Sequence, residues 1–178
     1  MKNSFLTSLV FCFLFIFYTN TSRAQQEFNL TGGTGSPEMI NVGLRMRVDQ
    51  NQYGLAIGTN LAYKNDNINV SGDYYYHFSG RSGHTSLRPW YIKSGLTYMH
   101  SEGDWEIRQN LLLVPRLGRE FNITPEFGVA LEAGIMLMLI DKNTAKKERT
   151  DAVSGDLDLI GSGFIQPSAG LKFFYRLY

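Results

Sequence analysis

The sequence has little cysteine and no excess of charge of either sign. Its one cysteine among 178 residues is Cys12, which excludes a disulfide framework and a cysteine-rich metal site. The 17 Lys and Arg residues nearly balance the 16 Asp and Glu residues. This balance lacks the basic footprint of a nucleic-acid-binding protein, so we expect no nucleic-acid partner. Helical spacing of apolar residues is almost absent after Gln25, which argues against a helical protein.

One long apolar run is present, and it lies at the N-terminus. Lys2 precedes apolar residues from Phe5 to Tyr18, and a polar segment with small residues follows up to Ala24. This pattern predicts a secretory signal peptide, residues 1–24. The run is shorter than the ~20 residues of a membrane-spanning helix, which argues against a helical membrane anchor. Cys12 lies inside the run rather than after it, which argues against a lipoprotein. We therefore expect one exported domain, residues 25–178, with 15 basic and 16 acidic residues once Lys2 and Arg23 are removed.

The remaining chain alternates apolar and polar residues with a period of two, which is typical of β-strands. The predicted strands are Glu27–Gly35, Met39–Val48, Tyr53–Tyr63, Ile68–Phe78, Trp90–Met99, Trp105–Leu117, Phe127–Leu139 and Ile165–Leu177. Turn residues such as Ser36-Pro37 join most of them, and longer links run over 79–89 and 141–161. These features predict an all-β fold, an eight-stranded antiparallel up-and-down β-barrel.

The polar face of these strands mixes small residues with opposed charges. Glycines such as Gly43, Gly54 and Gly128 alternate along it with long charged or aromatic side chains. An eight-stranded barrel is just wide enough for side chains to fill, so its interior needs small residues beside large ones. Buried charges also need partners of opposite sign. The pattern predicts a plugged interior held by a structural ionic cluster of Arg45, Lys93, Glu106, Arg108, Glu132, Lys172 and Arg176.

The other face is apolar, and aromatic residues gather near the strand ends. In Phe127–Leu139, seven consecutive positions on this face carry no polar side-chain atom. An apolar exterior with aromatic girdles and strands of about ten residues is typical of a transmembrane β-barrel. The predicted interfacial aromatic residues are Tyr53, Tyr63, Trp90, Tyr98, Trp105 and Tyr175. We expect an outer-membrane protein rather than a soluble barrel, because only a membrane barrel uses an apolar face outside and a crowded polar face inside. Closure also removes open sheet edges, which lipid cannot hydrogen-bond.

The mature chain resembles the small eight-stranded outer-membrane β-barrel proteins of Gram-negative bacteria. The resemblance is most specific over Phe28–Arg45 and over the aromatic end Leu171–Tyr178. It implies that Phe173, Tyr175 and Tyr178 form a C-terminal signal read by the β-barrel assembly machinery. Tyr178 departs from the family pattern, because it shares phase with the inward residues of its strand.

The resemblance also implies an orientation and a set of partners. Both chain ends and the 79–89 link would face the periplasm, and the 141–161 link would face the outside. The surrounding partners would be outer-membrane lipids and lipopolysaccharide, together with an unidentified extracellular partner of the loops.

Candidate chemistry is sparse. The segment His77-Phe78-Ser79 resembles part of the active site of outer-membrane lipid A deacylases. However, Gly80 stands where that family has asparagine, and no acidic residue that could orient the histidine follows before Glu102. Asp151, Asp156 and Asp158 lack the spacing and closing glutamate of a calcium loop. We predict no catalytic, cofactor-binding or metal-binding residue.

Three functional hypotheses follow from this sequence. The first is a non-enzymatic outer-membrane barrel that supports the envelope or presents loops to a partner. The second is an outer-membrane enzyme that modifies lipid A or phospholipid. The third is a narrow porin-like pore or transporter. The first is preferred, because no catalytic triad and no open interior can be recognised in the pattern.

Overall fold

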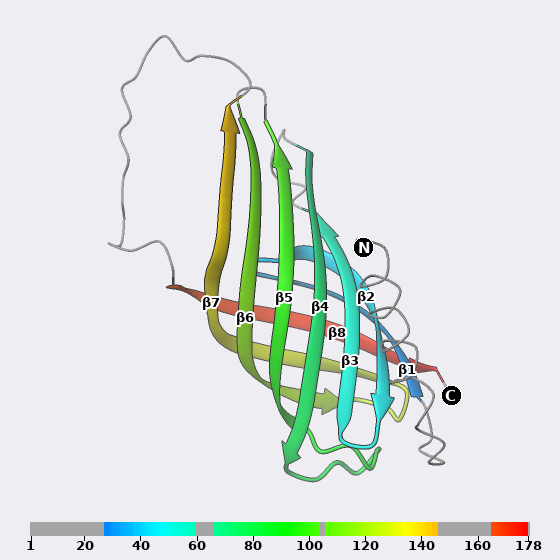
Figure 1. Ribbon diagram of the computed structural model, residues 1–178. Helices are drawn as coiled ribbons and strands as arrows, with labels where there is room; N and C mark the ends of the chain where they lie inside the picture. The colour runs from blue at the N-terminus through cyan, green and yellow to red at the C-terminus, as the bar shows by residue number, and fades with distance from the viewer. Residues whose placement is uncertain (1–26, 60–65, 104–105, 146–164, 178) are drawn as a thin grey trace, which may run out of the picture.

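The computed structural model describes residues 27–59, 66–103, 106–145 and 165–177, and all regular elements within them are β-strands. The strands close into an antiparallel barrel in which each strand pairs with its neighbours in sequence and β8 pairs with β1 (Figure 1). Their bounds are β1 Glu27–Gly35, β2 Met39–Val48, β3 Asn51–Thr59, β4 Asp66–Ser79, β5 Trp90–Glu102, β6 Glu106–Asn122, β7 Phe127–Ala145 and β8 Ile165–Leu177. The predicted fold class is confirmed.

Three strands, β1, β2 and β8, have the bounds that alternation predicted. Four, β4 to β7, are longer than predicted, and β3 begins earlier than the predicted Tyr53–Tyr63, of which residues 60–63 lie outside the described ranges. β6 continues past Leu117 to Asn122, and β7 continues past Leu139 to Ala145. The register between β6 and β7 shifts at Leu111, because Leu112 pairs with Met138 and Leu111 pairs with Ile140. Leu139 is therefore an extra residue, as in a β-bulge. The bulge breaks the period of two, and this concealed the last six residues of β7, 140–145, from the sequence pattern.

The two ends of the barrel differ in structure. The terminal end, as we name it, carries Glu27 and Leu177, the Asp49–Gln50 turn, and the connections 80–89 and 123–126. The opposite loop end carries the three-residue β1–β2 turn, Ser36 to Glu38. β8 pairs with β7 only as far as Leu137, so β7 continues to Ala145 without β8 beside it. Figure 1 shows the resulting asymmetry, with β4 to β7 rising beyond the rest of the barrel.

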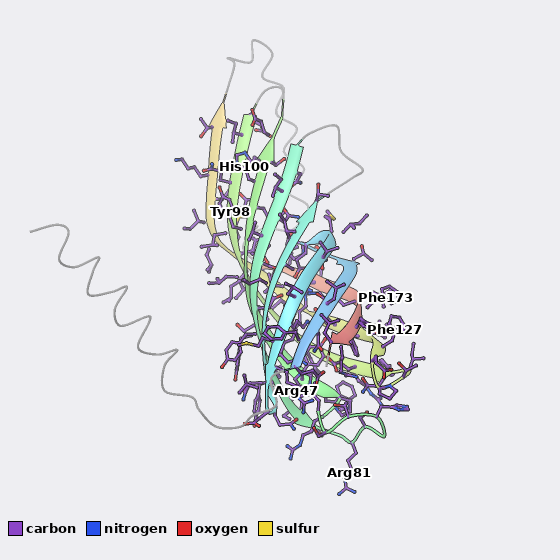
Figure 2. The ribbon with its side chains drawn as sticks, turned by 90° about the vertical axis from the view of Figure 1, so that its right-hand side faces the viewer. Arg47, Arg81, Tyr98, His100, Phe127 and Phe173 are labelled. Carbon is purple, nitrogen blue, oxygen red and sulfur yellow. The ribbon has the colours of Figure 1, made fainter. Side chains whose placement is uncertain are left out.

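Polar and apolar side chains are distributed in the reverse of a soluble protein. Arg45 and Glu132 are 2% and 4% exposed inside the barrel, whereas Leu55 and Leu131 are 72% and 52% exposed outside it. In Figure 2, Phe127 and Phe173 lie together on the outer surface, where their rings stack 6.4 Å apart. Within the described ranges, no helix is long and apolar enough to span a membrane.

The interior is filled by large side chains packed over glycines. A Cβ on Gly118 would collide with the ring of Tyr91, and a Cβ on Gly128 would collide with the ring of Phe174. Tyr91, Phe174, Tyr75 and Ala130 form the buried apolar cluster of the interior. Small residues on the inward face therefore provide the volume that the aromatic side chains occupy, as a narrow barrel requires.

Candidate functional site

The dominant feature inside the barrel is a connected set of ion pairs, which we call the ionic core. It involves every strand except β3, together with the β1–β2 turn. Its cations and anions alternate in space from the terminal end toward the loop end. Its members are the cations Arg45, Arg47, Lys93, Arg116, Lys172 and Arg176 and the anions Glu27, Glu38, Asp73, Glu120 and Glu132.

Glu132 on β7 is the centre of the ionic core. One carboxylate oxygen lies 2.9 Å from a guanidinium nitrogen of Arg116 and 3.7 Å from the ammonium of Lys93. The other oxygen accepts a hydrogen bond from the Tyr91 hydroxyl at 2.9 Å and lies 3.7 Å from Arg45. Four side chains from three strands, β2, β5 and β6, thus converge on one buried carboxylate, which compensates for its loss of hydration.

The loop-end part of the ionic core is organised by Glu38. Its carboxylate lies 2.6 Å from Arg116 and 3.0 Å from Lys93. Lys93 also lies 3.2 Å from Asp73, which in turn lies 3.9 Å from Lys172. The β1–β2 turn is therefore drawn into the barrel interior. Arg116 and the Ser168 hydroxyl both donate to the carbonyl of Ser36 and hold the turn there.

The charge state of Glu38 follows from these contacts. Glu38 belongs to the turn and lies outside the strands. Burial on its own raises the pKa of its carboxyl, but the cations Lys93 and Arg116 outweigh burial and lower it from 4.5 to about 2. Glu38 is therefore ionised at neutral pH and serves as a fixed counter-ion.

The terminal-end part of the ionic core links Arg45 to the chain ends. Arg45 lies 3.5 Å from Glu120, and Glu120 lies 3.2 Å from Arg176. Arg176 lies 3.0 Å from Glu27, which pairs with Arg47 at 2.8 Å. Because Glu27 is on β1 and Arg176 is on β8, these pairs join the first and last strands across the closure of the barrel.

The 80–89 connection closes the terminal end and is called the lid segment below. Its Leu87 side chain is 1% exposed, and its Ser86 hydroxyl accepts a 2.7 Å hydrogen bond from Arg47 on β2. Ser82 accepts a 2.9 Å bond from Asn122 at the end of β6. β2 and β6 lie on opposite sides of the eight-strand ring, so the segment crosses the barrel mouth from wall to wall.

Five of the seven residues predicted for the interior cluster are members of the ionic core: Arg45, Lys93, Glu132, Lys172 and Arg176. The other two, Glu106 and Arg108, lie elsewhere, which corrects the prediction. They pair with each other at 2.6 Å, and their side chains are 42% and 56% exposed. They pair with the part of β7 that continues beyond its pairing with β8, so they lie beyond the closed part of the barrel.

Several members of the ionic core were not among the predicted residues. Arg116 and Glu120 share the inward phase of β6, and extending that alternation past Leu117 would have found Glu120. Asp73 and Glu27 likewise face inward on β4 and β1. The sequence pattern gives no indication that Glu38 faces inward, because strand alternation does not describe the direction of a side chain in a turn.

The His77 and Ser79 side chains occupy different environments. His77 is fully buried, its Nδ1 atom lies 2.6 Å from the Arg88 carbonyl oxygen, and its ring packs against Tyr91 with centroids 4.9 Å apart. Ser79 is exposed and follows a register shift after His77. The imidazole therefore supports the lid segment rather than an exposed serine nucleophile.

The predicted aromatic residues that the structure describes lie on the outer face. Tyr53 packs beside Tyr74 with centroids 5.4 Å apart, and Trp90 lies beneath the guanidinium of Arg119 at 5.2 Å. Tyr98, Phe173 and Tyr175 are also outward and exposed. The predicted residues Tyr63, Trp105 and Tyr178, the signal peptide 1–24 and most of the 141–161 link lie outside the described residues.

Over the part of the chain that the structure describes, no group of three or more His, Cys, Asp or Glu side chains could hold a metal ion. The acidic residues of the ionic core are separated by cations and are neutralised by them. Comparison with known proteins adds no assignment, because no family model, curated protein or solved structure matches the chain.

Proposed function

We propose that this protein is an integral outer-membrane β-barrel without enzymatic activity, which supports the envelope or presents its loops to a partner. The observation that carries the proposal is the inversion of its two faces. Apolar side chains such as Leu55 and Leu131 cover the outside, and the charged side chains of the ionic core are enclosed. In water this distribution would leave a large apolar area exposed, whereas in a bilayer the apolar face would contact lipid and the closed sheet would leave no unpaired strand edge.

The outer surface near the terminal end supports the same proposal. The guanidinium of Arg119 lies over the rings of Trp90 and Phe121, at 5.2 and 4.9 Å from their centroids. Aromatic rings with polar edges, and long cationic side chains that reach outward, are typical of the boundary between lipid tails and headgroups. Arg119 is thus well placed to meet lipid phosphates at this boundary.

The interior supports a structural role over a porin-like role. The lid segment covers the terminal end, the ionic core fills the middle, and the aromatic cluster packs beside it. A conducting pore needs a continuous wet path, whereas here opposed charges on opposite walls are joined at 2.6 to 3.9 Å. The buried position of His77 likewise gives no support to a lipid-modifying enzyme.

The test is the behaviour of the purified chain in detergent. A membrane barrel refolded in micelles migrates faster on a gel when unboiled than when boiled, because the closed sheet resists the gel detergent. We expect this difference, together with sedimentation of the protein with the outer-membrane fraction of cells. Identical migration of both samples, with a protein that stays soluble without detergent, would show that the proposal is wrong.

A further inference from the structure

A cavity of about 320 Å³ lies inside the barrel at its loop end. Its floor is the β1–β2 turn at Ser36, which Arg116 and Ser168 fix over the ionic core. Its walls come from the extended strands β5, β6 and β7, with Leu112 among the wall residues. The interior therefore changes along the barrel axis, from ion pairs near the terminal end to an apolar cavity near the loop end.

The cavity concentrates one residue type. Four of the six methionines of the chain line it: Met39, Met99, Met136 and Met138. Methionine is flexible and polarizable, so methionine-rich walls adapt to ligands of varied shape. Small-molecule sites have volumes of roughly 300–1,000 Å³ and mainly apolar walls. The volume of this cavity is at the lower end of that range, which suits a slender ligand and excludes a folded protein element.

The rim of the cavity is continuous with the apolar outer surface. The barrel wall is low on one side, where β2 begins at Met39 and β8 begins at Ile165, and high along β5 to β7 (Figure 1). Met39 and Gln166 line the cavity, and the residues next to them in sequence, Ile40 and Ile165, are 49% and 58% exposed on the outer face. A chain crossing the low wall would thus pass from one apolar surface to another.

We propose that this cavity binds the hydrocarbon chain of a fatty acid. The chain would lie among the four methionines and Leu112, and the carboxylate would stay at the open rim near the exposed Gln166. The inference rests on the proposed function, because in an outer-membrane barrel the low side of the wall borders the lipid tails. The hydrocarbon chain of the fatty acid enters the cavity from there. The ion-paired floor sets the depth that the chain can reach.

The experiment uses the chain labelled with ¹³C at the methionine methyl groups and inserted into phospholipid nanodiscs. Dodecanoic acid is the probe, and the lipids are perdeuterated. We expect saturable shifts of the Met39, Met99, Met136 and Met138 methyl signals and direct ¹H contacts between them and the acid. Met46 faces outward on β2 and is the internal control, so its signal is expected to show no saturable response.

A second arm separates the two sources of a hydrocarbon chain. This arm uses protonated lipids and no added acid. Contacts from lipid tails to the four cavity methyl groups would show that a membrane lipid, rather than a free fatty acid, is the natural occupant. Such contacts would overturn the choice of ligand. A titration with Ag⁺ tests the soft-metal chemistry of thioethers. Saturation by Ag⁺ without any response to dodecanoic acid would also overturn the proposal.

Matched variants test the cavity walls. Changing Met136→Gln and Met138→Gln together places polar groups where the chain would lie, and we expect the dissociation constant of dodecanoic acid to rise by at least about tenfold. Met46→Gln is the control and is expected to leave it unchanged. If the double variant does not show heat-modifiable migration, it has not folded. The contacts of the wild-type methyl groups with the acid then decide whether the site exists.

Failure of this inference can be told apart from failure of the proposed function. A chain that inserts into nanodiscs with silent cavity methyl groups contradicts only the fatty-acid site. A chain that does not insert contradicts both.

Discussion

At the scale of single residues, the stability of the barrel interior depends on complete pairing of buried charges. Glu132 contacts Arg45, Lys93 and Arg116 as well as the Tyr91 hydroxyl. Removing one partner from a buried ion pair leaves the other charge without compensation, whereas an exposed pair contributes little. Replacing a buried glutamate such as Glu132 is therefore expected to lower the stability of the fold much more than replacing an exposed glutamate.

Changing Glu132→Gln keeps the size of the side chain and removes its charge. We expect a loss of about 3–5 kcal/mol in the free energy of unfolding, because three cations lose their common partner. The measurement is urea unfolding in detergent micelles, followed by tryptophan fluorescence. Glu106→Gln is the control, since Glu106 forms an exposed pair with Arg108, and about 0–1 kcal/mol is expected. Equal losses in both variants would contradict the assigned role of the ionic core.

Glu38 predicts how this stability changes with pH. Its pKa in the folded state, about 2, is below its ordinary value of 4.5, so its contribution is present above pH 4.5 and is lost as the pH falls toward 2. We therefore expect Glu38→Gln to lower the urea midpoint at pH 7, and to differ progressively less from wild type between pH 4.5 and pH 2. A difference that stays constant over this range would contradict an ionised Glu38.

At the scale of elements, turns and bulges carry features that the strand pattern does not reveal. The β1–β2 turn supplies Glu38 to the ionic core, the bulge at Leu139 lengthens β7, and the lid segment crosses the terminal end. Each depends on contacts between parts of the chain that are distant in sequence. The lid segment is anchored at two points, by Arg47 at Ser86 and by Asn122 at Ser82, and Leu87 next to Ser86 is buried.

Changing Leu87→Ser is expected to loosen the lid segment without opening the barrel. The lost burial favours local opening, and cleavage by trypsin after Arg81 follows the population of the open form. We expect cleavage in micelles to become about tenfold faster, while planar bilayers show no conductance because the ionic core is unchanged. The control is Ile123→Ser in the neighbouring turn, where the side chain is already exposed. Conductance in Leu87→Ser would identify the lid segment as a gate.

At the scale of the whole molecule, closure of the barrel determines which connections lie at the same end. Both described chain ends and the lid segment lie at the same end of the barrel. An even number of strands places the two chain ends on one side, and the 146–164 connection follows a strand that ends on the other side.

The orientation can be tested in cells. If the chain ends face the periplasm, trypsin added to intact cells is expected to cut between 141 and 161 and to leave Arg81 of the lid segment uncut. Cells with a permeabilised outer membrane serve as the control, in which cleavage at the lid segment becomes possible. Cleavage after Arg81 in intact cells would show the opposite orientation.

The sequence by itself determined the fold class, most strand positions and the composition of the two faces. These properties are local, because a period of two assigns each strand residue to one face whatever the strand pairs with. Arg45, Lys93, Glu132, Lys172 and Arg176 could therefore be assigned to the inward face before the structure was known. The same reasoning misplaced Glu106 and Arg108, because alternation does not tell where the opposite wall of a barrel ends.

The tertiary structure alone decided which charges pair, where the interior is closed and where it stays hollow. Glu38 enters the ionic core because the β1–β2 turn folds inward, and the methionine cavity exists because β5 to β7 outreach β8. Strand stagger, bulges and the path of the lid segment bring distant residues together. The physical reason is that these features depend on closure of the whole sheet, which a strand's own residues do not encode.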